Sequence, residues 1–270
     1  MKRSQSIFFL TAFLLSSIPL YGSAQSNNQK NKLQQILQSK ELRVCIWPDY
    51  YGITFRNPKT KTLTGIDIDI SIELEKDLDV KVRYVDSSFP ELVDNLIKNK
   101  CDIAMHAVGV TPARKAKLEF SQPYLRSDIY AITSKSNDAI QSWEDIDKPG
   151  KIIAVQDGTL MVSIMQNSLK LAKLEVVAPP LTREQEVESG RADAFMTDYP
   201  YSRRMLETTD WARMVAPTKP FNLTDYAYAI APGQPELLAR INSFIDKMKK
   251  DGRLRSIATK QKLDPIVVTN

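Results

Sequence analysis

Arg114 stands where positive charge is unfavourable. Thr111 and Pro112 form a helix start, because Thr supplies an N-cap oxygen and Pro at the first helical position loses no needed donor. A helix N-terminus already carries partial positive charge, yet Arg114, Lys115 and Lys117 follow in the first turn. A bound anion would satisfy the arginine and the helix end together, whereas the two lysines are interpreted as solvated surface charges.

A second charged residue, Asp198, ends a predicted strand later in the chain, and Gly158 with Thr159 precedes a predicted helix. The free N–H groups of that helix could bind an anion. Arginine binds a carboxylate through two parallel hydrogen bonds, and an aspartate facing a cleft accepts from an ammonium. The complement of this pair is an α-amino acid. The alternative is that these arginine and aspartate side chains are ordinary solvated charges.

Aromatic side chains would shape such a site. Trp47, Tyr50 and Tyr51 follow the first predicted strand, and Phe89 starts the helix after the second; the alternative is that these rings roof the core. His106, the only histidine, lies at the end of the third strand, where a structural role is more common than catalysis. We find no nucleophilic set of Ser, His and Asp and no cluster with metal-ligand spacing, so the sequence predicts no catalytic residues, no metal and no cofactor.

Two successive groups of elements must position these residues, and in both of them short apolar strands alternate with amphipathic helices. This βαβαβ pattern is typical of parallel sheets with helices on both faces, whose ligands bind beyond the carboxyl ends of the strands. We therefore predict an α/β fold of two lobes, each a mostly parallel sheet flanked by helices, with the site in the cleft between them. The elements are the strands 42–47, 80–85, 101–105, 151–156, 174–178, 192–198 and 224–233 and the helices 65–78, 89–99, 160–172, 183–190, 235–252 and 253–263.

The first residues indicate export. A short basic start, Met1 to Arg3, precedes an apolar run and the small residues Gly22 and Ala24, so we predict a signal peptide 1–24 cleaved after Ala24 and a periplasmic mature protein. The alternative is a membrane anchor. The remaining chain is predicted to consist of an N-terminal tether and short helix at 25–40, lobe 1 at 41–130 plus 227–270, and lobe 2 at 131–226.

The charge of the chain bears on nucleic-acid binding, and its cysteine content bears on disulfide formation. The chain has 37 Lys+Arg and 32 Asp+Glu, and loss of Lys2 and Arg3 leaves 35 against 32. No basic run with interleaved aromatic residues is present, so we predict no nucleic-acid partner. Cys45 and Cys101 fall in two predicted buried strands, and an even pair in an exported protein favours a disulfide over two separate buried thiols.

The chain resembles the family 3 solute-binding proteins of amino-acid ABC transporters, which have the type II periplasmic-binding-protein fold. The resemblance lies in "LTGIDIDISIELEKDLDVKV", "GVTPARKAKLEFSQPY", "GRADAFMTD" and "INSFIDKMKKDGRL" and spans 42–263. It implies that Arg114 grips a ligand carboxylate with help from Thr159 and that Asp198 takes the ammonium. It also implies that Tyr50 and Phe89 sandwich the ligand side chain, and that two crossover hinge strands lie near 127–133 and 225–229.

Several positions depart from the family pattern. The loop after the third strand, often rich in Ser or Thr, runs from His106 to Gly109, where a backbone donor remains but no hydroxyl. Trp47 replaces the aspartate of lysine- and arginine-binding relatives, and Leu160 and Met161 replace polar neighbours. We therefore expect a more apolar pocket, for an aromatic or aliphatic amino acid or a related carboxylate.

The resemblance implies a monomeric periplasmic protein that closes on this ligand, is not an enzyme, and delivers the ligand to a membrane ABC permease. Two alternatives share the fold. One is a periplasmic cyclohexadienyl (prephenate/arogenate) dehydratase, although here Tyr201 replaces the glutamate acid and Leu160 replaces an Asn of those enzymes. The other is a sensory or dehydrogenase-accessory binding protein. The pair Cys45 and Cys101 resembles the cysteine pair of the accessory group.

Overall fold

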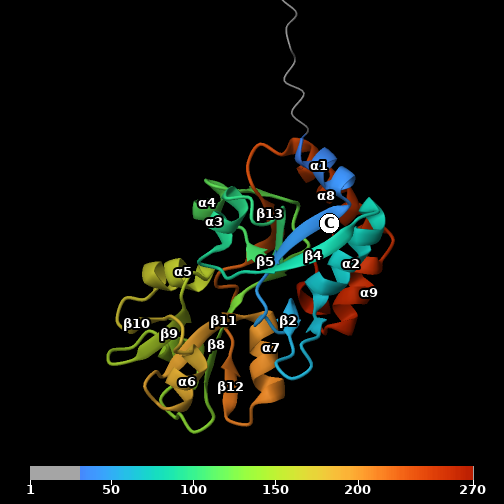
Figure 1. The fold of residues 1–270 in the computed structure, drawn as a ribbon. Coiled ribbons are helices and arrows are strands. Elements are labelled where there is room, and N and C mark those ends of the chain that lie inside the picture. Colours follow the sequence, from blue (N-terminus) through green and yellow to red (C-terminus); the bar gives the residue numbers. More distant parts are fainter. Residues whose placement is uncertain (1–30, 270) are drawn as a thin grey trace, which may run out of the picture. The chain divides into compact units, whose positions relative to one another are not determined.

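The computed structural model describes residues 31–269 (Figure 1). The predicted signal peptide, its cleavage site after Ala24 and residues 25–30 of the tether lie outside the described residues. The described part begins with α1 (Lys32–Ser39), where Asn31 and Gln34 cap each other's backbone N–H groups. Within residues 31–269, no helix is long and apolar enough to cross a membrane.

The first sheet joins a parallel core to antiparallel strands. It consists of β1 (Glu41–Ile46), β4 (Lys81–Asp86), β5 (Ile103–Gly109), β6 (Glu119–Phe120), β7 (Leu125–Ser127) and β13 (Thr224–Ile230). The order is β4–β1–β5–β13–β6, and β7 also pairs with β13. β1 runs parallel to β4 and β5, whereas β13 is antiparallel to β5, β6 and β7. A small hairpin of β2 (Phe55–Arg56) and β3 (Leu63–Thr64) precedes β4 in the chain.

The second sheet has the same mixed character. It consists of β8 (Ile129–Ser134), β9 (Ile152–Gln156), β10 (Lys173–Val177), β11 (Ala194–Asp198) and β12 (Ala212–Val215) in the order β10–β9–β11–β8–β12. β9 is parallel to β10 and β11, and β8 is antiparallel to β11 and β12.

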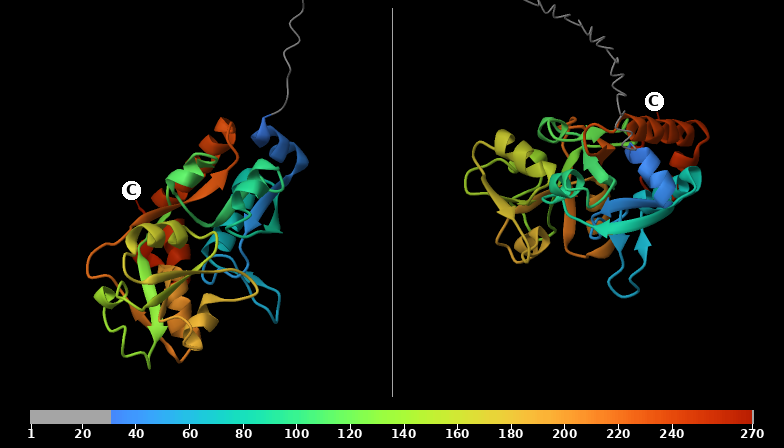
Figure 2. Two further views of the ribbon diagram at one scale, coloured as in Figure 1. Left: turned by 90° about the vertical axis from the view of Figure 1, so that its left-hand side faces the viewer. Right: turned by 45° about the horizontal axis from the view of Figure 1, so that its top comes forward.

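Each sheet is covered by its own helices (Figures 1 and 2). The first sheet is accompanied by α1, α2 (Ile66–Leu78), α3 (Leu92–Ile97), α4 (Pro112–Lys115), α8 (Pro235–Lys250), α9 (Arg253–Lys260) and the 3₁₀ turn η2 (Asp264–Ile266). The second sheet is accompanied by α5 (Leu160–Ser168), α6 (Arg183–Glu188), α7 (Tyr199–Thr208) and the 3₁₀ turn η1 (Trp143–Asp145). An amphipathic helix packs on a sheet through its apolar face. In α8 this face is a buried stripe at helical spacing, made of Leu237, Ile241, Phe244, Ile245 and Met248.

The predicted α/β fold with two flanked sheets is observed, but the sheets are more mixed than the alternating pattern predicted. Parallel neighbours need a crossover helix, whereas β8 and β13 enter their sheets directly from the other half of the chain and can run antiparallel. α7 was absent from the predicted elements, although Asp198 and Pro200 form a recognisable helix start. The lobe limits at 130/131 and 226/227 remain predictions, and β8 and β13 lie across them.

The two segments that pass between the sheets are tied to each other. The carboxylate of Asp128 accepts the backbone N–H groups of Ile129, Phe221 and Asn222 at 2.7–2.9 Å. The Oγ of Ser127 accepts the N–H at the first residue of α7, at 3.0 Å. These bonds hold both crossings at one place, as a hinge requires.

A disulfide joins Cys45 in β1 to Cys101 just before β5, as predicted, with their Cα atoms 5.6 Å apart. β1 and β5 are neighbouring parallel strands, which brings the two positions together. Both cysteines are buried in a small apolar cluster with Leu92 and Leu96 of α3. The bond therefore fastens the neighbouring strands β1 and β5 in the part of the first sheet on which α3 packs.

A buried carboxylate links α2 to the end of β5. Asp67 is 1% exposed and accepts the hydroxyls of Tyr124 and Tyr228 and the N–H of Ala107, at 2.7–3.1 Å. Ala107 has a φ of 48°, a left-handed conformation that few non-glycine residues adopt. Burial raises the pKa of Asp67 to about 6, although all three donors act to lower it. The strand end that approaches the cleft thus depends on this carboxylate.

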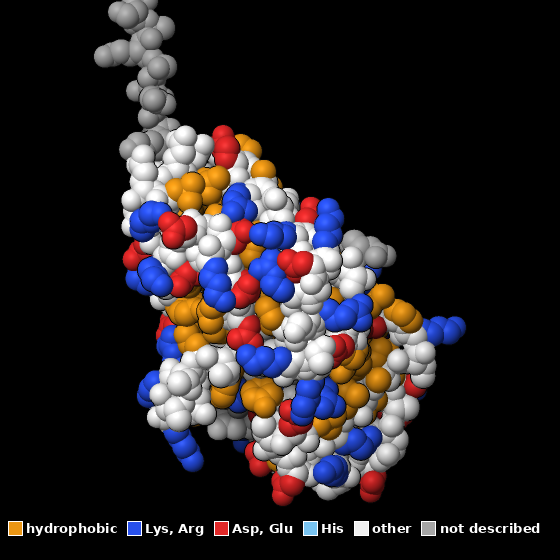
Figure 3. All heavy atoms as spheres, turned by 90° about the vertical axis from the view of Figure 1, so that its right-hand side faces the viewer, with side chains coloured by type: hydrophobic (Ala, Val, Ile, Leu, Met, Phe, Trp, Pro, Cys, Tyr) orange, Lys and Arg blue, Asp and Glu red, His pale blue; other side chains and the backbone are white. Residues whose placement is uncertain are grey.

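The face drawn in Figure 3 mixes both signs of charge. Basic and acidic side chains of α2 and α9 form ion pairs, including Arg253 with Glu73 at 2.8 Å and Lys260 with Asp69 at 2.9 Å. A nucleic-acid-binding surface gathers basic residues on one face. This face has no such single-sign stripe.

Removal of the disulfide should destabilise the protein. It closes a loop with a sequence separation of 56 residues, and the chain-entropy model gives about 4 kcal/mol for a loop of that length. We expect the Cys45→Ala/Cys101→Ala variant to lose about that much free energy of unfolding in urea titration. Wild-type protein titrated with and without a reductant is the control. Equal urea midpoints in all three samples would contradict this stabilising role.

The buried Asp67 should make stability depend on pH. Its pKa is about 6 in the folded protein and near 3.8 when unfolded, so the folded state binds the proton more tightly. The free energy of unfolding should therefore gain up to about 3 kcal/mol from this group as pH falls from 7 to below 4. Asp67→Asn removes the titration, and the wild-type advantage over this variant should grow as pH falls. A difference that stays constant between pH 7 and pH 4 refutes the assignment.

Candidate functional site

The carboxyl ends of strands from both sheets meet around a small inner cavity of about 20 Å³. The first sheet supplies residues after β1, after β4, at the end of β5 and on β13, and the second supplies the end of β11 and the starts of α5, α6 and α7. The lining residues are Trp47, Tyr50, Phe89, Ala107, Thr159, Leu160, Met161, Arg183, Thr197, Asp198, Tyr201 and Tyr226.

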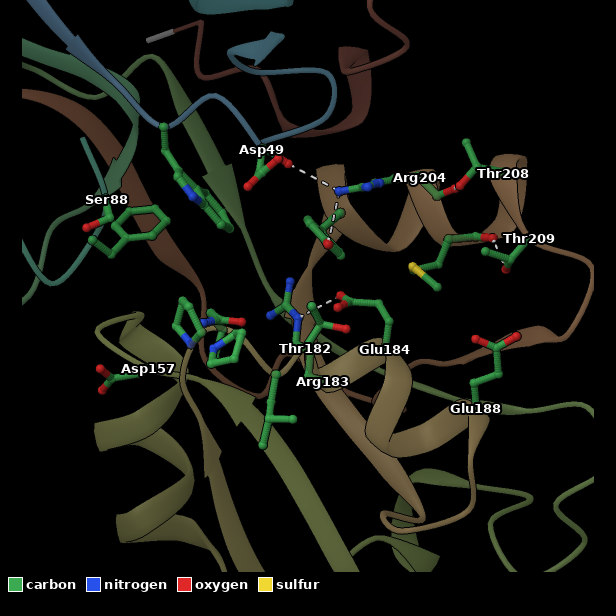
Figure 4. Close-up of a pocket in the computed structure, with 18 of the residues that line it drawn as sticks. Asp49, Ser88, Asp157, Thr182, Arg183, Glu184, Glu188, Arg204, Thr208 and Thr209 are labelled. Carbon is green, nitrogen blue, oxygen red and sulfur yellow. Dashed lines mark hydrogen bonds and ion pairs between the residues drawn. The ribbon is translucent and has the colours of Figure 1, made fainter. Parts of the chain in front are cut away.

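A wider, outer cavity of about 530 Å³ adjoins the inner cavity (Figure 4). The two share the lining residues Trp47, Phe89, Arg183 and Tyr201. At the boundary, Arg204 of α7 donates to the hydroxyl of Tyr201 at 3.0 Å and, across the cleft, to the carbonyl of Asp49 at 3.2 Å. The two cavities are therefore an inner and an outer part of one cleft.

Arg114 is a buried cation that packs on Phe89 and does not itself line either cavity. It is 9% exposed, and its Nη1 and Nη2 donate to the carbonyls of Gly109 and Gly158 at 3.0 and 3.2 Å. The guanidinium lies 5.2 Å from the ring centre of Phe89. Burial lowers its pKa to about 10, and among the described residues it forms no ion pair. The two carbonyl oxygens accept two of its five N–H groups and leave its charge uncompensated, which favours an anion nearby.

Asp198 supplies the opposite charge from the second sheet. It is 3% exposed, and its Oδ1 accepts the N–H of Tyr201 at 3.1 Å, which makes it the N-cap of α7. Its Oδ2 accepts the hydroxyls of Tyr226, at 2.7 Å, and of Tyr50. Burial, reinforced by the carboxylate charge, raises the pKa of both tyrosines well above the ordinary value, so they remain neutral donors.

The walls of the inner cavity are apolar. The ring centres of Trp47, Tyr50 and Phe89 lie 5.3–6.0 Å from one another, as in a cluster of edge-to-face aromatic contacts. Leu160 and Met161, at the start of α5, close the opposite side. Such walls suit a hydrophobic or aromatic portion of a ligand.

Two of the predicted site residues lie near α5 in constrained positions. Thr159 occupies the N-cap position of this helix, but its hydroxyl makes no cap bond and donates instead to the carbonyl of Gln156 at 2.7 Å. Gly109 lies against Leu160, where an added Cβ would be 2.5 Å from a leucine methyl carbon. A side chain at Gly109 would therefore displace Leu160.

His106 lies behind the site and does not line either cavity. It is fully buried, its Nδ1 is 3.2 Å from the carbonyl of Cys45, and its ring packs on Phe89 at 5.2 Å. Side chains alternate along a strand, so the lining position of Ala107 turns His106 to the other face. Burial lowers the pKa of His106 to about 4, so it is neutral at pH 7.

Sequence reasoning left out several lining residues. Tyr226 could have been recognised from the alternation in "TDYAYAI", and Tyr201 from the helix start at Asp198. Arg183 is buried at the start of α6, pairs with Glu184 at 3.1 Å and lies 4.2 Å from the ring centre of Tyr201. No local signal distinguishes this arginine from a surface one. Within the described residues, no group of His, Cys, Asp or Glu is arranged to hold a metal.

Comparisons with known proteins agree with this arrangement. The chain is 29% identical to the cyclohexadienyl dehydratase of Pseudomonas aeruginosa over 242 residues, covering 89% of this chain and 90% of that protein. It is 29% identical to the putative amino-acid ABC transporter-binding protein PatH of Vibrio harveyi over 222 residues, covering 82% and 88%.

Among solved structures, the ancestral amino acid-binding protein AncCDT-1, a precursor of cyclohexadienyl dehydratase, matches with a TM-score of 0.77. It is 33% identical, and the match covers 86% of this chain and 99% of that one. The sequence profile of the bacterial extracellular solute-binding proteins, family 3, matches residues 42–261. This chain, with its two sheets and the cleft between them, therefore belongs to the bacterial extracellular solute-binding proteins of family 3.

Proposed function

We propose that the protein captures a small amino-acid-like solute in its cleft and delivers it to a membrane ABC permease. We propose further that it acts as a monomer, without a nucleic-acid partner, after export and cleavage behind Ala24. The observation that carries the proposal is Arg114, a buried cation without an ion pair among the described residues, next to a cavity whose other side holds Asp198. The relatives named above as amino-acid-binding proteins support the same class of ligand.

Each end of an amino acid has a matching group. The carboxylate would bind Arg114 and the N–H groups at the start of α5 next to Thr159, and the ammonium would bind Asp198. Arg114 belongs to the first sheet's half and Asp198 to the second, so one ligand bridges both halves. Closure around the hinge would then be stabilised by contacts that only the closed form makes.

The side chain of the ligand would meet an apolar surface. Trp47, Tyr50 and Phe89 supply rings, and Leu160 and Met161 supply aliphatic contacts. These residues support a preference for aromatic or aliphatic amino acids or related carboxylates. His106 supports Phe89 from behind and is not assigned a ligand contact.

We propose that the protein is not an enzyme, although similarity to a cyclohexadienyl dehydratase keeps that activity as the second candidate. Dehydration needs a group that gives up a proton near neutral pH. Burial raises the pKa of Tyr201 to about 12. Burial also acts to raise the pKa of Glu184, but the charge of Arg183 and the hydrogen bonds that the carboxylate accepts together outweigh it, and the pKa lies below the ordinary value. The first group is too weak an acid for this step, and the second is already ionised.

Variants of the two charged residues test the ligand assignment. Arg114→Ala leaves the ligand carboxylate buried and unpaired, which costs about 3–5 kcal/mol, or roughly two to three and a half decades in affinity. Asp198→Asn should weaken amino acids strongly and spare carboxylates that lack the amine. A thermal-shift screen of amino acids and organic acids identifies the ligand, and calorimetry then measures affinity.

The matched controls are Lys115→Ala and Lys117→Ala, because both lysines are exposed and close to Arg114 in the chain. Both should bind within a few-fold of wild type. If Arg114→Ala also binds within a few-fold of wild type, the carboxylate assignment is wrong.

The second candidate is tested by turnover. Incubation with prephenate or arogenate at neutral pH should give product no faster than the spontaneous reaction, because neither Tyr201 nor Glu184 is a suitable acid. Rapid turnover that is lost in Tyr201→Phe or in Glu184→Gln would establish the protein as a dehydratase.

A further inference from the structure

The carboxylate of Asp198 already has hydrogen-bond donors from this chain. Tyr50 comes from the loop after β1, Tyr226 from β13 and Tyr201 from α7, and together they supply two hydroxyls and one N–H. The two hydroxyls share Oδ2, and both tyrosine side chains are buried, at 4% and 2% exposure. The position at which an ammonium would bind is therefore partly taken by tyrosine hydroxyls.

The two halves of the molecule also close on each other around this carboxylate. Tyr50 reaches Asp198 across the cleft, Arg114 reaches the carbonyl of Gly158, and Arg204 reaches the carbonyl of Asp49. The inner cavity of about 20 Å³ has room for about one water molecule. An amino acid or a 2-oxo acid can therefore enter only after the halves separate and the bond between Tyr50 and Asp198 breaks.

We propose that the Tyr50 hydroxyl, supported by Tyr226, is an internal competitor for Asp198 that weakens the preference of the site for amines. This inference rests on the proposed function, in which Arg114 takes the ligand carboxylate and Asp198 takes the ammonium. It identifies Tyr50 as a residue that sets how strongly an amino acid is preferred over a carboxylate of the same shape without the amine.

The asymmetry follows from comparing two matched ligands. An α-amino acid donates to Asp198 and must replace the hydroxyl there, so it gains only the difference between the two charge-assisted bonds. The corresponding 2-oxo acid has no donor at that carbon, so the hydroxyl can bind the carboxylate again once the halves have closed around this ligand. Competition therefore lowers the affinity for the amino acid and leaves that for the 2-oxo acid nearly unchanged.

Tyr50→Phe tests the proposal, because it keeps the ring and removes only the hydroxyl. The probes are L-leucine with 4-methyl-2-oxopentanoate and L-phenylalanine with phenylpyruvate, each measured by calorimetry. We expect the ratio of amino-acid to 2-oxo-acid affinity to rise about tenfold, in keeping with removal of one competing hydrogen bond to a charged group. Tyr51→Phe is the matched control, since Tyr51 packs on Phe55 outside the inner cavity, and its ratio should not change.

An unchanged or lower ratio in Tyr50→Phe overturns the proposal. Its failure is separable from failure of the proposed function, because loss of the carboxylate site is read from Arg114→Ala and not from this ratio. If neither probe pair binds, small-angle scattering of the ligand-free protein tests whether the tyrosine hydroxyls hold the two halves together through Asp198. The Tyr50→Phe/Tyr226→Phe variant should have a larger radius of gyration than wild type, and equal radii refute the competition.

Discussion

Among the described residues, the buried guanidinium of Arg114 has no carboxylate partner, and the groups around the cleft are arranged about this charge. Arg114 is held by two carbonyl oxygens and an aromatic ring, and burial lowers its pKa to about 10. The cost of such burial is tolerable where an anion completes the site. Leu160 packs closely on Gly109 next to the guanidinium, so a larger residue than glycine does not fit there.

The negative charge opposite Arg114 is Asp198, which comes from the second sheet. Asp198 ends β11 and caps α7, while Arg114 follows β5, so the two groups converge only when the halves of the chain close. Asp128 binds N–H groups in both crossing segments and fixes the place about which closure occurs. The antiparallel strands β8 and β13 continue these crossings into the two sheets. In the proposed function, closure about the hinge at Asp128 brings Arg114 and Asp198 to the two ends of one ligand.

The same scaffold serves binding proteins and an enzyme among the relatives of this chain. Dehydration needs a proton donor, whereas binding does not. Here Arg183 lies beside both Tyr201 and Glu184, and Arg204 donates to the hydroxyl of Tyr201. The charge of Arg183 favours the ionised form of Glu184 over the protonated one.

From the sequence one can recognise the alternation of strands and helices, the helix start at Thr111, the cysteine pair, and Arg114 and Asp198 as candidate binding residues. These features depend on neighbours within a few positions or on residue type, and such signals are local. It takes the folded chain to show that β8 and β13 run antiparallel, that His106 lies behind Phe89, and that the hydroxyl of Tyr50 reaches Asp198. The last two residues are 148 positions apart, and their contact depends on how two sheets pack, which no local pattern records.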